Sequence, residues 1–270
     1  MRLLAAAILG LVVSTAATAA QLHITGELVQ GGLVMGKALP GARVRLGGRA
    51  LLVAGDGTFV FGLGRDAPAT VTLTVTIPGG SAETRTLRIR QRKYKVQRID
   101  GLPPAKVEPS PEDMQRIRAD GALIRAARAR KTARTWFQGG FSWPVVGPVS
   151  GVFGSRRILN GKPRRPHSGT DVAAPAGTTV RAPAAAVVAM ARTGMFFTGG
   201  TVVLDHGMGV STIYAHMSEV LVRDGQKVAR GEPIGRVGAT GRVTGAHLHW
   251  GASWFQTRLD PQLLAGPMPR

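Results

Sequence analysis

Histidine and aspartate side chains in the second half of the sequence carry the strongest chemical signal. His167 and Asp171 stand four residues apart, and His247 and His249 stand two residues apart. The segment 168–172 contains glycine and two β-branched residues, which favours a strand, and residues two or four apart on a strand project from one face. His167, Asp171 and one of the two later histidines can therefore present donors to one point. Three protein ligands with an open fourth position are typical of catalytic zinc.

Further motifs around these residues resemble those of a known family. The His-x-Gly-x-Asp string is followed by Tyr-Ala-His-Met at 214–217, Gly-Ala-Thr-Gly at 238–241 and Gly-Ala-His-Leu-His-Trp at 245–250. This order resembles the lysostaphin/LytM-type zinc endopeptidases, which cut peptidoglycan peptides, over roughly residues 141 to 265. The resemblance implies one zinc ion per chain, held by His167, Asp171 and His249, with His216 and His247 as a catalytic pair. None of these is substituted here, whereas relatives of this kind that lack ligands act as regulators.

The chemistry of such a site follows from its parts. A zinc ion lowers the pKa of its bound water toward ~7 and polarises the scissile carbonyl. The leaving nitrogen of an amide must also receive a proton. His216 and His247 can deprotonate the water, hold the developing oxyanion and deliver that proton, because unperturbed imidazole titrates near ~6.5. Either of the two histidines can be the general base.

Two other assignments of the histidines were weighed. Two histidines and one carboxylate with open positions also describe non-haem iron oxygenases. An export signal argues against that class, and no second binding site for an organic co-substrate is marked in the sequence. His23 and His206 are interpreted as ordinary hydrogen-bonding side chains, with His206 in a turn after an apolar run.

Substrate contacts are expected from two places. Thr212, Tyr214 and His216 share a parity, so on a regular strand His216 emerges on the same face as Tyr214. Tyr214 is therefore a candidate substrate-binding residue. Before the first histidine of the motif, on what the sequence suggests is a loop, lie arginines able to bind carboxylates of stem peptides. Arg156 and Arg157 are the candidates chosen from this set, which also includes Arg164 and Arg165.

The first twenty residues predict export. Arg2 precedes an apolar run from Leu3 to Val13, and small residues continue to Ala20. This is the pattern of a secretory signal peptide over 1–20. The Ala-Thr-Ala at 17–19 fits the cleavage rule, so that the mature chain begins at Ala20 or Gln21, and an uncleaved anchor is the lesser alternative. The protein is expected in the periplasm or at the cell surface or outside it. With no cysteine in the chain, disulfides and lipoprotein attachment are excluded.

The charge predicts an anionic partner. Thirty-five Lys and Arg face fifteen Asp and Glu, a formal net charge of +20. For an exported chain the partners expected are peptidoglycan, and also anionic wall polymers or a membrane surface. Nucleic acid is not expected, because no nucleic-acid motif is found and aromatic residues make up only 5% of the chain. A generally solvated surface accounts for part of this charge, and no oligomeric state is predicted.

The organisation predicted is mainly β. Residues 21–100 form short strands with turns, among them an alternating strand at 71–77 and a Gly-Asp-Gly hairpin turn at 55–57. We expect a β-sandwich that resembles immunoglobulin-like modules. Residues 101–136 are a Pro-rich linker and a basic helix, with Ser110 as N-cap and Pro111 at its first position. Residues 137–266 form the zinc endopeptidase domain, an antiparallel β groove domain of the LytM/lysostaphin type.

The sequence therefore predicts an exported zinc-dependent endopeptidase that hydrolyses amide bonds in peptidoglycan stem peptides or cross-links. The alternative is a non-hydrolytic peptidoglycan-binding regulator that activates another cell-wall hydrolase. Intact ligands count against that alternative. A basic membrane-binding or nucleic-acid-binding protein would leave the aligned histidines and aspartate unexplained.

Overall fold

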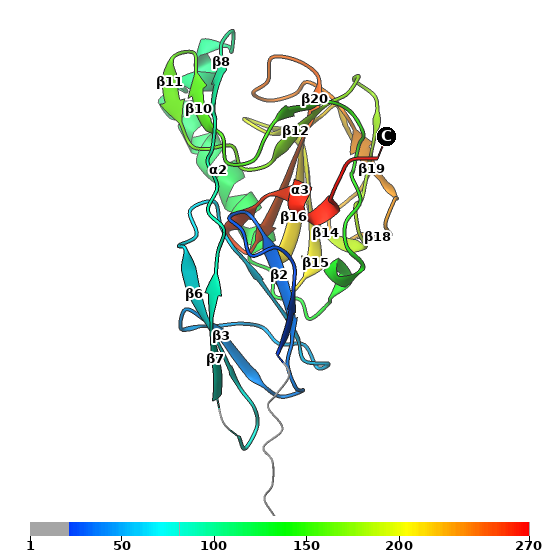
Figure 1. Ribbon diagram of the computed structural model, residues 1–270. Coiled ribbons are helices and arrows are strands. Elements are labelled where there is room, and N and C mark those ends of the chain that lie inside the picture. The colour runs from blue at the N-terminus through cyan, green and yellow to red at the C-terminus, as the bar shows by residue number, and fades with distance from the viewer. Residues whose placement is uncertain (1–21, 81, 270) are drawn as a thin grey trace, which may run out of the picture.

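The computed structural model describes residues 22–80 and 82–269 (Figure 1). The predicted signal peptide at 1–20 lies outside the described residues. The mainly β fold is confirmed. Its elements are β1 (His23–Thr25), β2 (Leu33–Lys37), β3 (Arg43–Leu46), β4 (Arg49–Ala50), β5 (Thr58–Gly62), β6 (Thr70–Thr76), β7 (Ala82–Arg88), β8 (Val96–Ile99), α1 (Pro104–Val107), α2 (Pro111–Arg128), the 3-10 helix η1 (Trp136–Gly139), β9 (Val149–Gly151), β10 (Arg156–Leu159), β11 (Lys162–Arg164), β12 (Thr170–Ala173), β13 (Thr179–Arg181), β14 (Ala186–Met195), β15 (Gly199–Gly207), β16 (Val210–Met217), β17 (Glu219–Val220), β18 (Lys227–Val228), β19 (Pro233–Arg236), β20 (His247–Trp254), β21 (Thr257–Leu259) and α3 (Pro261–Ala265).

The N-terminal part consists of two antiparallel sheets that share one core. Their strand orders are β1-β2-β5 and β4-β3-β6-β7. The alternating pattern of β6 buries Leu73 and Val75, which pack with Phe59 of the other sheet. The predicted turn at 55–57 returns the chain so that Val53 bridges Phe59 in antiparallel fashion. The two layers form the expected sandwich, and its likeness to immunoglobulin modules remains a prediction.

An eight-stranded antiparallel sheet forms the centre of the C-terminal part. Its order is β18-β14-β15-β16-β20-β12-β9, with β21 paired to β20. Leu248 and Trp250 of β20 are fully buried in a core that also contains Val172 and Tyr214. Because side chains alternate along a strand, the histidines of β20 project from the opposite face of this sheet. A smaller sheet, β13-β19-β17, packs beside it.

The two parts are joined by apolar packing. Trp254 of β20 and Leu259 of β21 belong to the same buried cluster as Phe59 and Phe61 of β5. Gly62 lies so close to this seam that an added Cβ would be 2.8 Å from Trp254 and from Leu259. The sandwich therefore packs directly against the eight-stranded sheet, below it in the view of Figure 1.

The segment between the two parts is folded onto the C-terminal part. Strand β8 pairs in parallel with β10, and β10 pairs with β11, which gives a further, three-stranded sheet at the upper left of Figure 1. Arg156, Arg157 and Arg164 therefore lie in strands. The loop expected at these arginines is wrong, because β8 and the neighbouring hairpin strand supply backbone partners that no local sequence pattern indicates.

The basic helix has the predicted N-terminus. The Ser110 hydroxyl accepts a hydrogen bond from the Asp113 N–H at 3.1 Å, and Pro111 is the first helical residue. Near its other end, Ile124 and Ala127 pack on Val203 and on other apolar residues of the eight-stranded sheet. In the described part of the chain, no helix is long and apolar enough to cross a membrane.

His206 is a core residue. It lies in β15 with no exposed surface, its Nδ1–H donates to the Ala185 carbonyl at 2.9 Å, and its Nε2 is 2.8 Å from the Thr212 hydroxyl. The Phe141 ring packs against it edge-on. Burial lowers the pKa of His206 from 6.5 to about 4. His206 thus makes the hydrogen bonds of an ordinary polar side chain, but it stands in strand β15 and not in the expected turn.

We expect His206→Asn to weaken the dependence of stability on pH. Because the folded pKa of about 4 lies below the ordinary 6.5, neutral His206 stabilises the fold fully above pH ~6.5, and that contribution is lost as the pH falls toward ~4. The variant should be less stable by about 1–3 kcal/mol near neutral pH, since the buried Thr212 hydroxyl loses a partner. On acidification, the variant should then lose less stability than the wild type.

Thermal melts over this pH range measure the difference between the two slopes. His23→Asn, which changes an exposed histidine in β1, is the matched control. Equal slopes for His206→Asn and the wild type would contradict the assignment of a neutral buried imidazole.

Candidate metal centre

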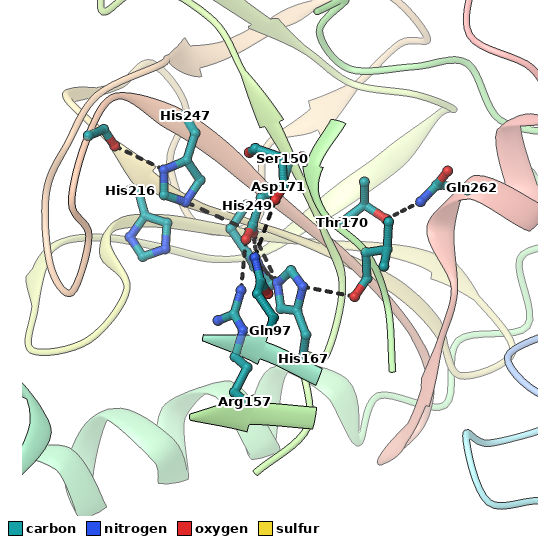
Figure 2. A network of polar contacts seen from close by, with 12 residues as sticks. Gln97, Ser150, Arg157, His167, Thr170, Asp171, His216, His247, His249 and Gln262 are labelled. Carbon is teal, nitrogen blue, oxygen red and sulfur yellow. Dashed lines mark hydrogen bonds and ion pairs between the residues drawn. The ribbon is translucent and has the colours of Figure 1, made fainter. Parts of the chain in front are cut away.

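Strand pairing brings the predicted ligands together. Asp171 of β12 and His249 of β20 are direct partners across the antiparallel ladder, so they project from the same face. Asp171 Oδ1 lies 2.8 Å from His249 Nδ1 and 3.0 Å from His167 Nε2. One donor atom from each residue lies within 4.8 Å of the other two. Figure 2 shows the three side chains converging on one point.

The hydrogen bonds of the rings identify the donor atoms. His167 Nδ1 is 3.2 Å from the Val152 carbonyl oxygen. A carbonyl only accepts, so Nδ1 carries the proton and Nε2 has a free lone pair. That lone pair faces His249 Nδ1 at 3.0 Å. Ligating histidines commonly donate their second N–H to a backbone carbonyl in this way, so the arrangement fits metal binding through His167 Nε2 and His249 Nδ1.

The protonation states also fit a metal ion. Burial lowers the pKa of His167 from 6.5 to about 4, so this ring is neutral at neutral pH. Burial alone would raise the pKa of Asp171, but its close contacts with His167 and His249 hold that pKa well below its usual range. A divalent cation requires deprotonated ligands. A set of two imidazole nitrogens and one carboxylate oxygen is among those that zinc takes in catalytic sites.

Arg157 contacts the ligand carboxylate from below in Figure 2. Its Nη2 lies 2.8 Å from Asp171 Oδ2, and its side chain is mostly buried. Arg157 therefore holds one oxygen of Asp171 and leaves the other facing His167 and His249. This contact commits Arg157 to the carboxylate of the ligand set. Arg156, next to it on β10, is exposed and points away from this contact, as alternation requires.

Glycine is required at position 169 of the His-x-Gly-x-Asp motif for a steric reason. A Cβ on Gly169 would lie 2.3 Å from the Trp250 carbonyl oxygen and 3.0 Å from the His249 ring. Contacts that short do not occur between real atoms. Only glycine lets the segment between His167 and Asp171 approach β20 closely enough for the donors to meet.

His216 and His247 lie side by side next to the ligand cluster. Their ring centroids are 4.9 Å apart, and the His216 ring is 6.1 Å from the His249 ring. His216 Nδ1–H donates to the Thr240 carbonyl at 2.8 Å, and His247 Nδ1–H donates to the Gly245 carbonyl at 2.9 Å. The Nε2 atom of each ring therefore carries a free lone pair. His247 Nε2 is 3.9 Å from Asp171 Oδ1.

Burial sets the charge of His216. Burial and, to a smaller extent, the nearby rings of His249 and His247 together lower the pKa of His216 from 6.5 to about 3. His216 is therefore neutral at neutral pH and can accept a proton at Nε2. Together with His247, it lines a small cavity that reaches Asp171.

The expectation that His216 and Tyr214 share a strand face is wrong. His216 has a positive φ of 68°, and the register between β15 and β16 shifts between Gly200 and Val202. This irregularity turns the His216 ring to the face of His249. Tyr214 stays on the opposite face, fully buried in the core, with its hydroxyl 2.7 Å from Thr212 Oγ1. The structure does not bring Tyr214 to the cavity.

The sequence analysis missed part of the cavity wall. Ile99, Leu102 and Leu159 line the cavity together with His216, His247 and Arg242. Asn160 holds the backbone of Leu102 in place: its side chain accepts a hydrogen bond from the Leu102 N–H at 3.2 Å and donates one to the Leu102 carbonyl at 2.7 Å. Ile99 and Leu102 come from the segments assigned to the sandwich and the linker. The nearby prolines are typical of a linker, so the sequence does not indicate that apolar residues of this segment pack on the site.

Comparisons with known proteins agree with this site. The model of peptidase family M23 matches residues 165–261. The peptidoglycan DD-endopeptidase ShyA of Vibrio cholerae is 47% identical over 103 residues, which are 38% of this chain and 24% of ShyA. The DD-carboxypeptidase/endopeptidase Mpg of Neisseria meningitidis is 41% identical over 135 residues, 49% of this chain and 31% of Mpg. The chain thus spans about a quarter to a third of the length of these curated relatives.

A solved structure extends the likeness to nearly the whole chain. The crystal structure of a Pseudomonas aeruginosa protein assigned to peptidase M23 is 32% identical, with a TM-score of 0.67. The superposition covers 89% of this chain and 96% of that chain. It therefore includes the N-terminal sandwich and the connecting segment as well as the eight-stranded sheet. On this likeness and on the match over the candidate metal centre, the chain belongs to peptidase family M23.

Proposed function

We propose that this protein is an exported, zinc-dependent endopeptidase that hydrolyses amide bonds in peptidoglycan stem peptides or their cross-links. The observation that carries the proposal is the convergence of His167, Asp171 and His249 beside two further histidines, His216 and His247, at one cavity. The names of ShyA and Mpg support peptidoglycan as the substrate. Export follows from the pattern of residues 1–20 and from the location of that substrate outside the cytoplasmic membrane.

The ligand residues and the two neighbouring histidines divide the chemistry. A zinc ion held by His167, Asp171 and His249 would polarise the scissile carbonyl and lower the pKa of a water molecule toward ~7. His216 and His247 keep a free lone pair on Nε2, because each Nδ1–H is held by a backbone carbonyl. Either ring can take a proton from the attacking water.

A protonated ring then has a second use. As an imidazolium, it becomes a donor at Nε2, able to stabilise the developing oxyanion and to pass the proton to the leaving nitrogen. The low pKa of His216, about 3, describes a ring that releases an acquired proton readily. Arg157 keeps Asp171 oriented throughout, because it binds the oxygen that does not face the histidines.

One observation favours the alternative of a non-hydrolytic peptidoglycan-binding regulator. Ile99 and Leu102 of the connecting segment form part of the cavity wall, which restricts the room for a peptide. Against it stands the complete set of candidate ligands with two further histidines beside them, which a purely binding protein does not need. Bound zinc without peptide release from peptidoglycan would favour the regulator.

Removal of one donor should abolish metal binding. We expect about one zinc per wild-type chain, the number for a site with three protein ligands and water, and much less than one in His249→Ala. A chelator should lower the melting temperature of the wild type, because a ligand that binds only the folded state stabilises it, and should leave His249→Ala unchanged. Elemental analysis and thermal melts measure both. Exposed His23→Ala is the control, and undiminished zinc in His249→Ala would contradict the ligand assignment.

Removal of either neighbouring histidine should spare the metal and damage the reaction. His216→Ala and His247→Ala are each expected to keep about one zinc and to lower kcat by about 10²–10⁴, the usual contribution of general acid–base catalysis. Release of peptides from purified peptidoglycan gives the rate. Loss of zinc in these variants, or a kcat equal to that of His23→Ala, would contradict their assignment as catalytic residues.

A further inference from the structure

The cavity beside the candidate metal centre is rich in positive charge. Arg157 and Arg242 both line it, and in the described parts of the chain Asp171 is its only carboxylate. Asp171 is already engaged by His167, His249 and Arg157. A bound divalent cation would add further positive charge. The cavity is therefore suited to an anionic group that the protein itself does not supply.

Arg242 is held rigidly at this cavity. Its guanidinium carbon lies 4.2 Å from the centre of the Phe197 ring, and its backbone N–H donates to the Phe197 carbonyl at 2.9 Å. Phe196 in turn packs edge-on against Phe197. The guanidinium plane is thus fixed by stacking and by the backbone, which leaves its N–H groups free to bind another molecule.

The hydrogen-bonding capacity of Arg242 is largely unused. A guanidinium has five N–H donors, but within the described residues the Arg242 side chain makes one hydrogen bond, a 3.5 Å contact from Nη1 to the Lys106 carbonyl. Arg157 is bound to Asp171. Arg164 donates to the Val107 and Pro163 carbonyls at 2.8 Å each. Of the two arginines that line the cavity, Arg157 is paired with a carboxylate, and Arg242 is the one without a carboxylate partner among the described residues.

The charge of Arg242 also lacks compensation. No acidic side chain of the described residues forms an ion pair with it. Burial and, to a smaller extent, the positive charges of Arg157 and Arg164 together lower its pKa to about 10. At neutral pH it remains a cation. A partly buried cation without an anion costs free energy, and an anionic ligand in the cavity would offset that cost.

We infer that Arg242 is a specificity-determining residue, which binds a free carboxylate of the stem peptide close to the scissile amide. Carboxylate geometry matches the parallel N–H groups of a guanidinium. A substrate with an amide in place of that carboxylate would lose the charge-assisted bond and leave Arg242 uncompensated. This inference rests on the proposed function for the kind of substrate, and it goes beyond it by naming the group that is selected.

The test compares two forms of one substrate. Cross-linked muropeptides are prepared from purified peptidoglycan, and half of them are treated with carbodiimide and ammonia, which converts free carboxylates to amides. Zinc-loaded wild-type protein should prefer the untreated form. Arg242→Gln should raise KM for the untreated form by about 10- to 100-fold, the effect of one charge-assisted hydrogen bond, while kcat and KM for the amidated form change little. Arg242→Lys keeps the charge but loses the parallel N–H groups of the guanidinium, so its KM for the untreated form should lie between those of the wild type and Arg242→Gln.

Arg223→Gln is the matched control, because Arg223 is exposed and does not line the cavity. Zinc content and melting temperature show that each variant is folded and loaded. Equal effects of Arg242→Gln on both substrate forms, or no effect on either, would overturn the inference and leave the proposed hydrolysis intact.

Binding of the same muropeptides, measured by calorimetry, separates the two proposals. If the wild type binds the untreated form more tightly and Arg242→Gln removes this preference, the inference holds even when no peptide is released. In that case the proposed hydrolysis is what fails. Peptide release with no preference for either form would support the proposed hydrolysis and overturn the inference about Arg242.

Discussion

The pairing of β12 with β20 in one register is the constraint on which the rest of the site depends. It sets Asp171 opposite His249 and Val172 opposite Leu248. A slip of one residue would turn the ligands into the core and the apolar residues to the cavity. The burial of Val172, Leu248 and Trp250 opposes any such slip. Hydrophobic packing on one face of the sheet therefore fixes the geometry of the metal ligands on the other.

The second part of the site depends on a departure from regular strand geometry. A non-glycine residue with positive φ, such as His216 at 68°, costs on the order of 1–3 kcal/mol. The surrounding backbone offsets this cost: the His216 N–H donates to the Thr198 carbonyl at 2.7 Å, and its Nδ1–H donates to the Thr240 carbonyl at 2.8 Å. Thr240 belongs to the Gly-Ala-Thr-Gly motif at 238–241. This motif therefore has a structural role, because its backbone holds the His216 ring at the cavity.

The convergence of the candidate ligands can be predicted from the sequence and the cavity wall cannot, for a physical reason. His167, Asp171 and His249 lie in short motifs whose strand alternation can be read locally. Tyr214 was misplaced because a bulge reverses the alternation at the next histidine, and nothing in the residue types marks it. Leu102 was read as part of a linker because its contacts come from residues such as Asn160, far along the chain. Long-range packing of this kind has no local signature in the sequence.

The most direct test of the central claim is a crystal structure of the zinc-loaded protein with data collected at the zinc absorption edge. We expect one anomalous peak at about 2.0–2.2 Å from His167 Nε2, from an oxygen of Asp171 and from His249 Nδ1, the distances usual for zinc with these donors. His216 and His247 should lie beside the peak without touching it. A peak bound by His216 or His247, or no peak in this cluster, would contradict the assignment of the ligands.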